Sequence, residues 1–182
     1  MQLTALIDRG HTVLMAAIIY ETGFPIDEFM SAVAEALRAD GLRLCGAIQR
    51  NAGNRSCPDM SLVDIATGER VGISQELGSR ARGCRLDPRG FAAATALLDT
   101  TMTDDFDLLV VNKFGKTEAE GAGLRDAFAH AVGAGIPVLM AVRKPYTEAW
   151  FAFHGGFAAA LAPTLDAVLA WCRGAVRESR TT

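Results

Sequence analysis

The chain has 182 residues, of which half are apolar, and its 18 basic and 21 acidic side chains give a net charge of −3. This length supports one sizeable hydrophobic core, and we expect a single domain over residues 1–182. The balanced charge, without long runs of one sign, argues against general affinity for nucleic acid or for an anionic membrane. A small molecule or a protein is therefore the expected partner.

The cysteine pattern and the N-terminal segment indicate the compartment. The four cysteines contain no C-x-x-C pair, and no histidine is placed to complete a zinc site, so we expect reduced thiols and no bound metal. The N-terminus lacks a basic region followed by a cleavable apolar stretch, and no apolar segment approaches the ~20 residues needed to cross a bilayer. These features predict a cytoplasmic protein.

The first element expected along the chain is a buried strand. Val13–Tyr20 is continuously apolar, which is typical of a central strand of a parallel sheet that is covered on both faces. Pro25 and Asp27 then predict a break and a helix N-cap, and apolar side chains recur at helical spacing until Asp40. Together these elements form a β-α unit.

A second strand and a hairpin are expected next. Leu42–Ile48 is the strand candidate, and the polar, glycine-containing stretch Gln49–Pro58 predicts an exposed loop. Met60–Ala66 and Arg70–Ser74 flank Thr67–Glu69, a short connection that contains glycine, which predicts an antiparallel pair. The polar groups at these strand ends, Gln49 among them, are weaker candidates for lining a cleft.

A helix is expected after the polar stretch that ends at Asp87. Pro88 suits the first helical position, Asp87 suits the N-cap, and Phe91–Leu98 is alanine-rich and helical in pattern. Just before this helix, Arg85 is a candidate to bind an oxyanion, and Cys84 is a candidate nucleophile if Arg85 and the helix N-terminus lower its pKa. The alternative is a structural cap beside a surface arginine.

The second half of the chain continues the alternation of strands and helices. Phe106–Val111 and Ile136–Val142 predict buried strands, Gly121–Ala134 predicts the helix between them, and amphipathic helices are expected near Thr147–Phe153 and Thr164–Val176. The strand-helix-strand order implies a right-handed crossover. We therefore expect a three-layer α/β/α domain with a mainly parallel sheet and a β-hairpin insert.

Ligands of open α/β sheets bind beyond the carboxyl ends of the strands, so two connections are candidate sites. The first, Tyr20–Asp27, lies where a P-loop would carry G-x-x-x-x-G-K-[ST], but it has one glycine and no lysine, which disfavours ATP binding through a Walker A loop. Thr22 and Gly23 are candidates to donate hydrogen bonds to a ligand. The alternative is a plain strand-to-helix turn.

The second connection begins at Asn112 and ends at Glu120, and it holds two of the chain's three lysines. Asn112, Lys113 and Lys116 are candidates to bind phosphoryl or other oxyanion oxygens. Glu118 and Glu120 are candidates to orient a hard cation or to act as a base on water. The alternative is a solvated loop with Lys–Glu pairs, each of which contributes little.

Four segments of the chain look like those of a bacterial family of unknown function, whose members are often encoded beside molybdenum-uptake or nitrogenase genes. They are N-K-F-G-K-T-E-A-E-G-A-G-L-R (Asn112–Arg125), G-I-P-V-L-M-A-V (Gly135–Val142), C-R-L-D-P (Cys84–Pro88) and W-F-A-F-H-G-G (Trp150–Gly156). That family is similar to small P-loop-like nucleoside triphosphatases. The resemblance implies a P-loop-like fold with a degenerate Walker A loop, in which Asn112 and Lys113 stand where an Asp-Glu pair is expected, and it implies a role near molybdenum metabolism.

Two functions are compatible with these features. The first is a nucleotide- or oxyanion-binding protein, with slow phosphoanhydride hydrolysis, if any, assisted by Mg²⁺. The second is a non-catalytic accessory or regulatory protein that binds a partner in metal-cofactor assembly, with a homodimer through the aromatic C-terminal surface as one form of it. For the first function, the ligand-binding residues are Thr22, Gly23, Arg85, Asn112, Lys113 and Lys116, and the catalytic residues are Glu118 and Glu120.

Overall fold

A computed structural model of the chain describes residues 13–52, 59–75, 86–102, 105–115, 118, 120 and 124–181. Within these residues, seven strands form one sheet in the order β4-β3-β2-β5-β6-β1-β7. β2, β5, β6, β1 and β7 run parallel, whereas β3 and β4 are antiparallel to their neighbours. The strands are β1 (Met15–Tyr20), β2 (Leu44–Ala52), β3 (Asp59–Asp64), β4 (Arg70–Gly72), β5 (Leu108–Phe114), β6 (Val138–Arg143) and β7 (Ala159–Leu161).

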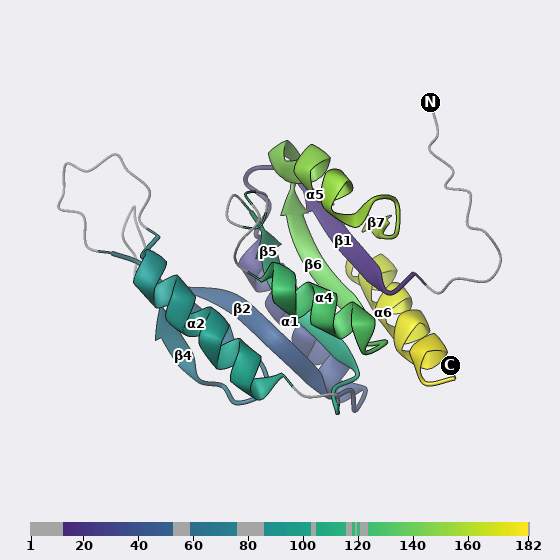
Figure 1. Cartoon of the computed structure of the whole chain (residues 1–182). Helices are drawn as coiled ribbons and strands as arrows, with labels where there is room; N and C mark the ends of the chain where they lie inside the picture. Colours follow the sequence, from purple (N-terminus) through teal and green to yellow (C-terminus); the bar gives the residue numbers. More distant parts are fainter. Residues whose placement is uncertain are drawn as a thin grey trace.

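Helices cover both faces of the sheet (Figure 1). One face is covered by α1 (Ile26–Ala39) and α6 (Leu165–Ser179), whose apolar side chains share a core cluster with the strands. The other face is covered by α2 (Pro88–Thr101), α4 (Arg125–Gly133) and α5 (Thr147–His154), which follows a short 3-10 turn at Lys144–Tyr146. The expected three-layer α/β/α architecture with its hairpin insert is therefore confirmed.

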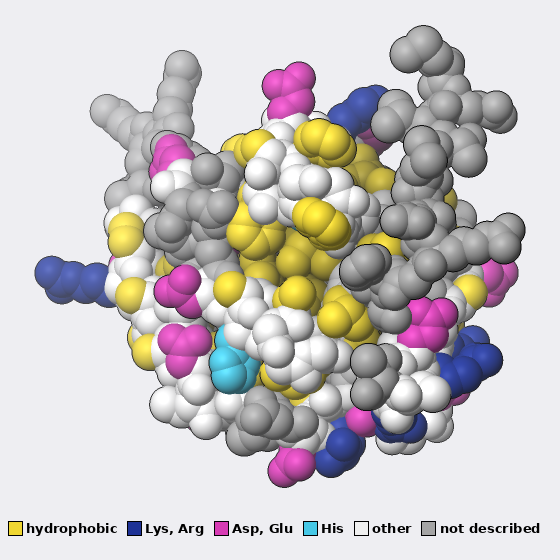
Figure 2. All heavy atoms as spheres, turned by 45° about the vertical axis from the view of Figure 1, so that its right-hand side comes forward, with side chains coloured by type: hydrophobic (Ala, Val, Ile, Leu, Met, Phe, Trp, Pro, Cys, Tyr) yellow, Lys and Arg dark blue, Asp and Glu magenta, His cyan; other side chains and the backbone are white. Residues whose placement is uncertain are grey.

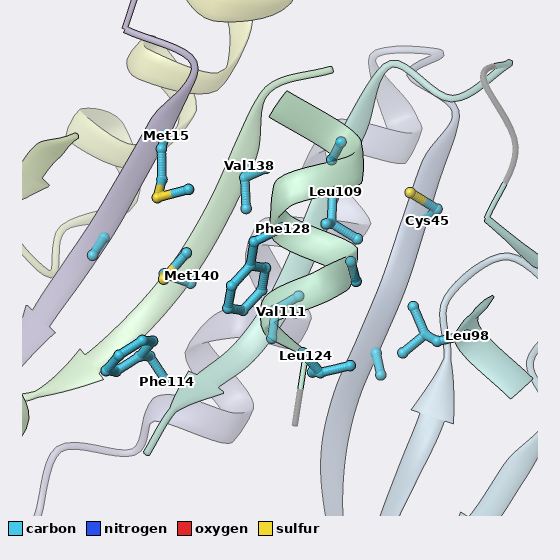
Figure 3. Close-up of a cluster of buried hydrophobic side chains, with 14 of the residues drawn as sticks. Met15, Cys45, Leu98, Leu109, Val111, Phe114, Leu124, Phe128, Val138 and Met140 are labelled. Carbon is cyan, nitrogen blue, oxygen red and sulfur yellow. The ribbon is translucent and has the colours of Figure 1, made fainter. Parts of the chain in front are cut away.

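The central strands are apolar at nearly every position because each face of the sheet packs against its own hydrophobic core. Along β5, Leu108 and Val110 pack with α1 and α6, whereas Leu109 and Val111 pack on the opposite face. Figure 3 shows Phe128 of α4 lying over the second of these faces, among residues of β5 and β6. Alternation along a strand thus sends successive apolar side chains into two different cores.

Two strands extend further than the apolar pattern predicts. β2 continues through Gln49 to Ala52 because these polar residues pair antiparallel with β3, from Gln49 opposite Leu62 to Ala52 opposite Asp59. The expectation that a loop begins at Gln49 is therefore wrong, while residues 53–58 lie outside the described part. β5 likewise continues through Asn112 and Lys113. At the end of β2, polar side chains occupy strand positions because β3 satisfies the backbone groups.

The two predicted helix caps have different outcomes. Asp87 is the N-cap of α2, where its side chain accepts a hydrogen bond from the Arg89 backbone N–H at 3.0 Å, as the sequence predicts. Asp27 is not a cap, because α1 begins at Ile26 and its N-cap position is Pro25. The Asp27 side chain is therefore available for other contacts. No helix within the described residues is long and apolar enough to cross a membrane.

Candidate functional site

A β-bulge in β5 brings two consecutive polar side chains to the same face of the sheet. Between Val111 and Phe114 the register against β6 shifts, because the pairs Val111–Met140 and Phe114–Val142 leave one more residue on β5 than on β6. Phe114 thereby returns to the core that holds Val111. The two residues between them, Asn112 and Lys113, both contact α1. Bulges beside functional sites commonly redirect side chains in this way.

The carboxylate of Asp27, in the first turn of α1, is the centre of a polar cluster at the carboxyl ends of β2 and β5. Its Oδ1 accepts from Asn112 Nδ2 at 2.6 Å and lies 2.9 Å from Lys113 Nζ. Its Oδ2 accepts from Asn51 Nδ2 at 2.8 Å. Three side-chain donors from two strands therefore converge on one carboxylate, and the Asp27 side chain is only 12% exposed.

Gln49 closes these contacts into a ring. Lys113 Nζ donates to Gln49 Oε1 at 3.2 Å, and Gln49 Nε2 donates to Asn51 Oδ1 at 2.8 Å. Asn51 in turn donates to Asp27. Lys113 is therefore linked to the carboxylate of Asp27 in two ways, directly and through Gln49 and Asn51. We call Asp27, Gln49, Asn51, Asn112 and Lys113 the Asp27 cluster. It holds one positive and one negative side chain and is neutral as a unit.

The buried amide of Asn112 has an acceptor without a partner among the described residues. Asn112 is 2% exposed, and its Oδ1 makes no hydrogen bond there. The orientation of the amide is determined by Asp27, because a carboxylate only accepts and so must face the NH₂ group. Buried polar atoms in native proteins are nearly always paired, with protein, water or ligand. The free acceptor therefore marks a point where a donor from outside the described residues fits.

The next strands along the edge contribute more cations. Arg143 ends β6 beside Tyr20 of β1, its guanidinium lies 5.6 Å from the ring centre of Tyr146, and its buried Nε has no hydrogen-bond partner within the described residues. Lys144 follows and pairs with the exposed Glu21. Burial raises the pKa of the Tyr20 hydroxyl, while the charge of Arg143 opposes that shift. This edge therefore offers cationic donors over β5, β6 and the turn after β6.

Of the remaining predicted ligand-binding residues, the structure describes two, Thr22 and Gly23. Thr22 and Gly23 are exposed in the connection between β1 and α1, and Gly23 adopts a φ of +94°, a conformation that favours glycine. Arg85 and Lys116 lie outside the described residues. The structure thus brings Asn112 and Lys113 to the segment that follows Thr22 and Gly23, and their roles toward a ligand stay predictions.

Glu118 and Glu120 occupy different environments. Glu118 is 4% exposed, and its carboxylate accepts backbone N–H bonds from Gly115 at 2.9 Å and Leu124 at 3.5 Å. Burial raises the pKa of Glu118, although these N–H groups oppose the shift. Glu120 is exposed. The geometry of Glu118 suits a carboxylate that holds its own segment together, and the catalytic role given to both residues stays a prediction.

Replacement of Glu118 by glutamine is expected to reveal how much free energy of folding is lost by burying the Glu118 charge. Because the pKa of Glu118 is raised in the folded state, this loss is fully present above the folded-state pKa. It disappears as the pH falls toward the ordinary pKa of 4.5. The stability of the wild type relative to Glu118→Gln should therefore increase as the pH is lowered from 7, measured by urea unfolding at each pH. The control is Glu120→Gln, because Glu120 is exposed. If the difference in unfolding free energy between the wild type and Glu118→Gln did not change with pH, Glu118 would not carry a buried charge.

Among the described residues, the donor set of the site does not suit a resident Mg²⁺ ion, which proteins hold through carboxylate oxygens. Both oxygens of Asp27 already accept from side chains, and those of Glu118 accept from the backbone. No group of three or more His, Cys, Asp or Glu residues that could hold a metal occurs in the part of the chain that the structure describes. P-loop enzymes hold Mg²⁺ with a P-loop Ser or Thr and a Walker B Asp. Here the corresponding end of β5 carries Asn112 and Lys113.

The connection between β1 and α1 lacks the lysine of a P-loop. The motif G-x-x-x-x-G-K-[ST] joins a strand to a helix and supplies that lysine near the start of the helix. Residues 21–25 of this chain contain Glu21 and no lysine, and Asp27 lies in the first turn of α1. Asp27 contacts the ammonium group of Lys113, near the end of β5.

These features define the class of the protein: a three-layer α/β/α domain with a mainly parallel sheet and a polar cluster at the carboxyl ends of its strands. The fold is similar to that of a solved structure titled "Solution Structure of a Human Cancer-Related Nucleoside Triphosphatase", with a TM-score of 0.58, 14% identity and coverage of 92% of this chain and 98% of that one. A family model described as "Protein of unknown function (DUF2478)" matches residues 15–171, and the chain belongs to this family.

A longer protein contains a related segment. The chain is 40% identical over 161 residues to the "Molybdenum import ATP-binding protein ModC 2" of Bradyrhizobium diazoefficiens. The match covers 87% of this chain but 18% of that protein. The chain therefore spans less than a fifth of the length of this relative, and the name of the relative describes a much larger molecule.

Three members of the Asp27 cluster are not identified as site residues by the sequence. The sequence predicts a helix cap at Asp27 and a loop at Asn51, and it indicates Gln49 only as a weaker candidate at a strand end. A signal was present, since all three are polar residues near the carboxyl ends of strands or the N-terminus of a helix. Their mutual contact depends on how β2, β5 and α1 pack.

Proposed function

We propose that this protein binds a small tetrahedral oxyanion, either free or as the phosphate of a nucleotide, at the carboxyl edge of β2, β5 and β6, and that it does not hydrolyse the ligand. The observation that carries the proposal is the convergence of Asn51, Asn112 and Lys113 on one point that a carboxylate already occupies. Hydrogen-bond donors that are arranged around one anionic group are also suited to bind another anionic group. Arg143 and Lys144 extend this set along the edge.

The relatives support the choice of ligand. One is named as an ATP-binding protein of molybdenum import, and the structural neighbour is titled as a nucleoside triphosphatase. A nucleotide presents tetrahedral phosphate groups, and molybdate is itself a tetrahedral oxyanion, so both ligands have the same chemistry toward Lys113 and Arg143. A role in molybdenum metabolism is accordingly part of the proposal.

The absence of hydrolysis follows from the residues that the site contains. Phosphoryl transfer in P-loop enzymes depends on a lysine and a metal ion that neutralise charge developing on the phosphates. In this chain the connection from β1 to α1 carries no lysine, Asp27 in the first turn of α1 would repel a phosphate close to it, and the end of β5 offers an amide and an ammonium group. The described residues therefore supply cations that can bind an anion, but they do not supply the catalytic arrangement of a P-loop enzyme.

Calorimetry distinguishes the possible ligands. ATP, GTP, inorganic phosphate and molybdate are titrated into the wild type with Mg²⁺ and with a chelator, and phosphate release from ATP and GTP is measured in parallel. We expect binding of at least one anion that does not depend on Mg²⁺, loss of that binding in Lys113→Met, and no phosphate release. The control is Arg177→Met, an exposed cation on α6.

Three results would contradict the proposal. Absence of heat with every anion would remove the site, and unchanged binding by Lys113→Met would place the site elsewhere. Phosphate release that depends on Mg²⁺ and is lost in Lys113→Met would show that the site is catalytic.

A second candidate function is binding of a protein partner, and a specific surface favours it. Phe151 and Phe157 are 58% and 78% exposed, on α5 and just after it. Figure 2 shows apolar side chains gathered on the face turned toward the right-hand side of Figure 1, the side of β7. Exposed apolar patches are typical of interaction sites. If a second copy of the chain docks there, sedimentation velocity should show a dimer that Phe151→Ser with Phe157→Ser dissociates, and a monomeric wild type would exclude this.

A further inference from the structure

The Asp27 cluster has the composition of an anion site whose anion belongs to the protein itself. Asp27 accepts from Asn51, Asn112 and Lys113, at distances between 2.6 and 2.9 Å. The three donors belong to β2 and β5, which pair with each other in the sheet just before the donors, at Leu44–Ala47 and Leu108–Val111. Asp27 alone comes from a helix, and its side chain can rotate without moving a strand.

We propose that Asp27 is an internal competitor for the ligand: its carboxylate holds the donors of the site until an external tetrahedral oxyanion replaces it. The inference rests on the proposed function, because it requires that an oxyanion binds at this edge. It adds a regulation of that binding, because Asp27 lowers the affinity of the site for phosphate.

The donors have capacity left for such an exchange. Lys113 has three N–H groups, of which Asp27 and Gln49 use two, and its side chain is 33% exposed, so an incoming anion can reach it. The neighbouring Arg143 Nε needs an acceptor, which an oxyanion oxygen supplies. The unpaired Oδ1 of Asn112 suits a hydroxyl or protonated oxygen of the same ligand.

The charge of the cluster explains why the exchange controls affinity. With Asp27 in place, Lys113 is neutralised and an anion gains little from approaching it. When the carboxylate turns away, Lys113 and the two amides face the ligand together, and Asp27 stays near the N-terminus of α1, where a negative charge is favourable. The ligand must therefore outcompete one internal carboxylate, and removing the charge of that carboxylate removes the competition.

The experiment compares Asp27→Asn with the wild type by calorimetry, using inorganic phosphate and molybdate on the full chain in the presence of a chelator. We expect the variant to bind the effective anion at least about tenfold more tightly. The matched control is Asp40→Asn, which removes the same charge at the other end of α1, where Asp40 pairs with Arg173 at 2.8 Å. Its affinity should equal that of the wild type.

A second measurement uses the wild type alone and does not depend on how well a variant folds. The side-chain NH₂ signals of Asn51 and Asn112, assigned by NMR, should shift together during a titration with the anion, because both groups change their acceptor.

Each outcome bears on the inference or on the function beneath it. If the wild type and Asp27→Asn bind equally, or the variant binds more weakly, Asp27 is not a competitor although the anion site stands. If the anion binds while the two asparagine signals stay in place, the exchange does not occur. If no anion binds to either protein, the proposed function and this inference both fail.

Discussion

Gly46→Ala is expected to destabilise the protein by about 3 kcal/mol or more, which is a large share of the ~5–15 kcal/mol by which a typical domain is stable. Gly46 lies in β2 with a φ of +117°, a conformation that side-chain-bearing residues rarely adopt. A Cβ placed there would lie 1.9 Å from the carbonyl oxygen of Val110, its partner in β5. Val110 is part of the central ladder, so its backbone cannot move aside without breaking the sheet.

The measurement is urea unfolding of the variant followed by circular dichroism, with Gly174→Ala as control. Gly174 lies inside α6, where a Cβ would meet nothing within 4 Å, so alanine there should stabilise the helix by about 0.5–1 kcal/mol. Because β2 carries Gln49 and Asn51 while β5 carries Asn112 and Lys113, the close approach at Gly46 also positions the Asp27 cluster. Wild-type stability in Gly46→Ala would show that the two strands do not approach this closely.

Asp27→Ala is expected to lower the free energy of unfolding by about 1–3 kcal/mol, because it leaves the buried amide of Asn112 without its acceptor. Lys113→Met should cost less, about 1 kcal/mol, since Asp27 keeps two amide donors. In the double variant the loss should be smaller than the sum of the single losses, since groups in one hydrogen-bond network are coupled. Urea unfolding of the four proteins measures this coupling.

The pair formed by Asp40 and Arg173 is the control for this cycle. Its side chains are 35% and 48% exposed, compared with 12% and 33% for Asp27 and Lys113. An exposed ion pair contributes about 0–1 kcal/mol, so the coupling in the Asp40–Arg173 cycle should be near the lower end of that range. Strict additivity in the Asp27–Lys113 cycle would mean that the ring of hydrogen bonds does not form in solution.

Local sequence patterns were sufficient to predict most of the strands and helices of the fold. The apolar runs at Val13–Tyr20 and Phe106–Val111 predicted buried parallel strands because only a strand covered on both faces is apolar at every position. The N-cap at Asp87 was equally predictable, since its side chain bonds two residues along the chain. The strand β7 is not predicted by the sequence, because the three residues of Ala159–Leu161 are too few to show a hydrophobic periodicity. This strand is recognised by its pairing with β1.

The sequence by itself determined that this protein is a three-layer α/β domain and that Asn112 and Lys113 follow a central strand, because apolar period and strand order are encoded in neighbouring residues. Only the tertiary structure decided that these two side chains meet a carboxylate. Asp27 lies 85 positions from Asn112 and 24 from Asn51, and a bulge in β5 turns Asn112 and Lys113 to the same side. Local rules make an aspartate near a helix start a cap, whereas the packing of α1 against β2 and β5 makes it the centre of the candidate site.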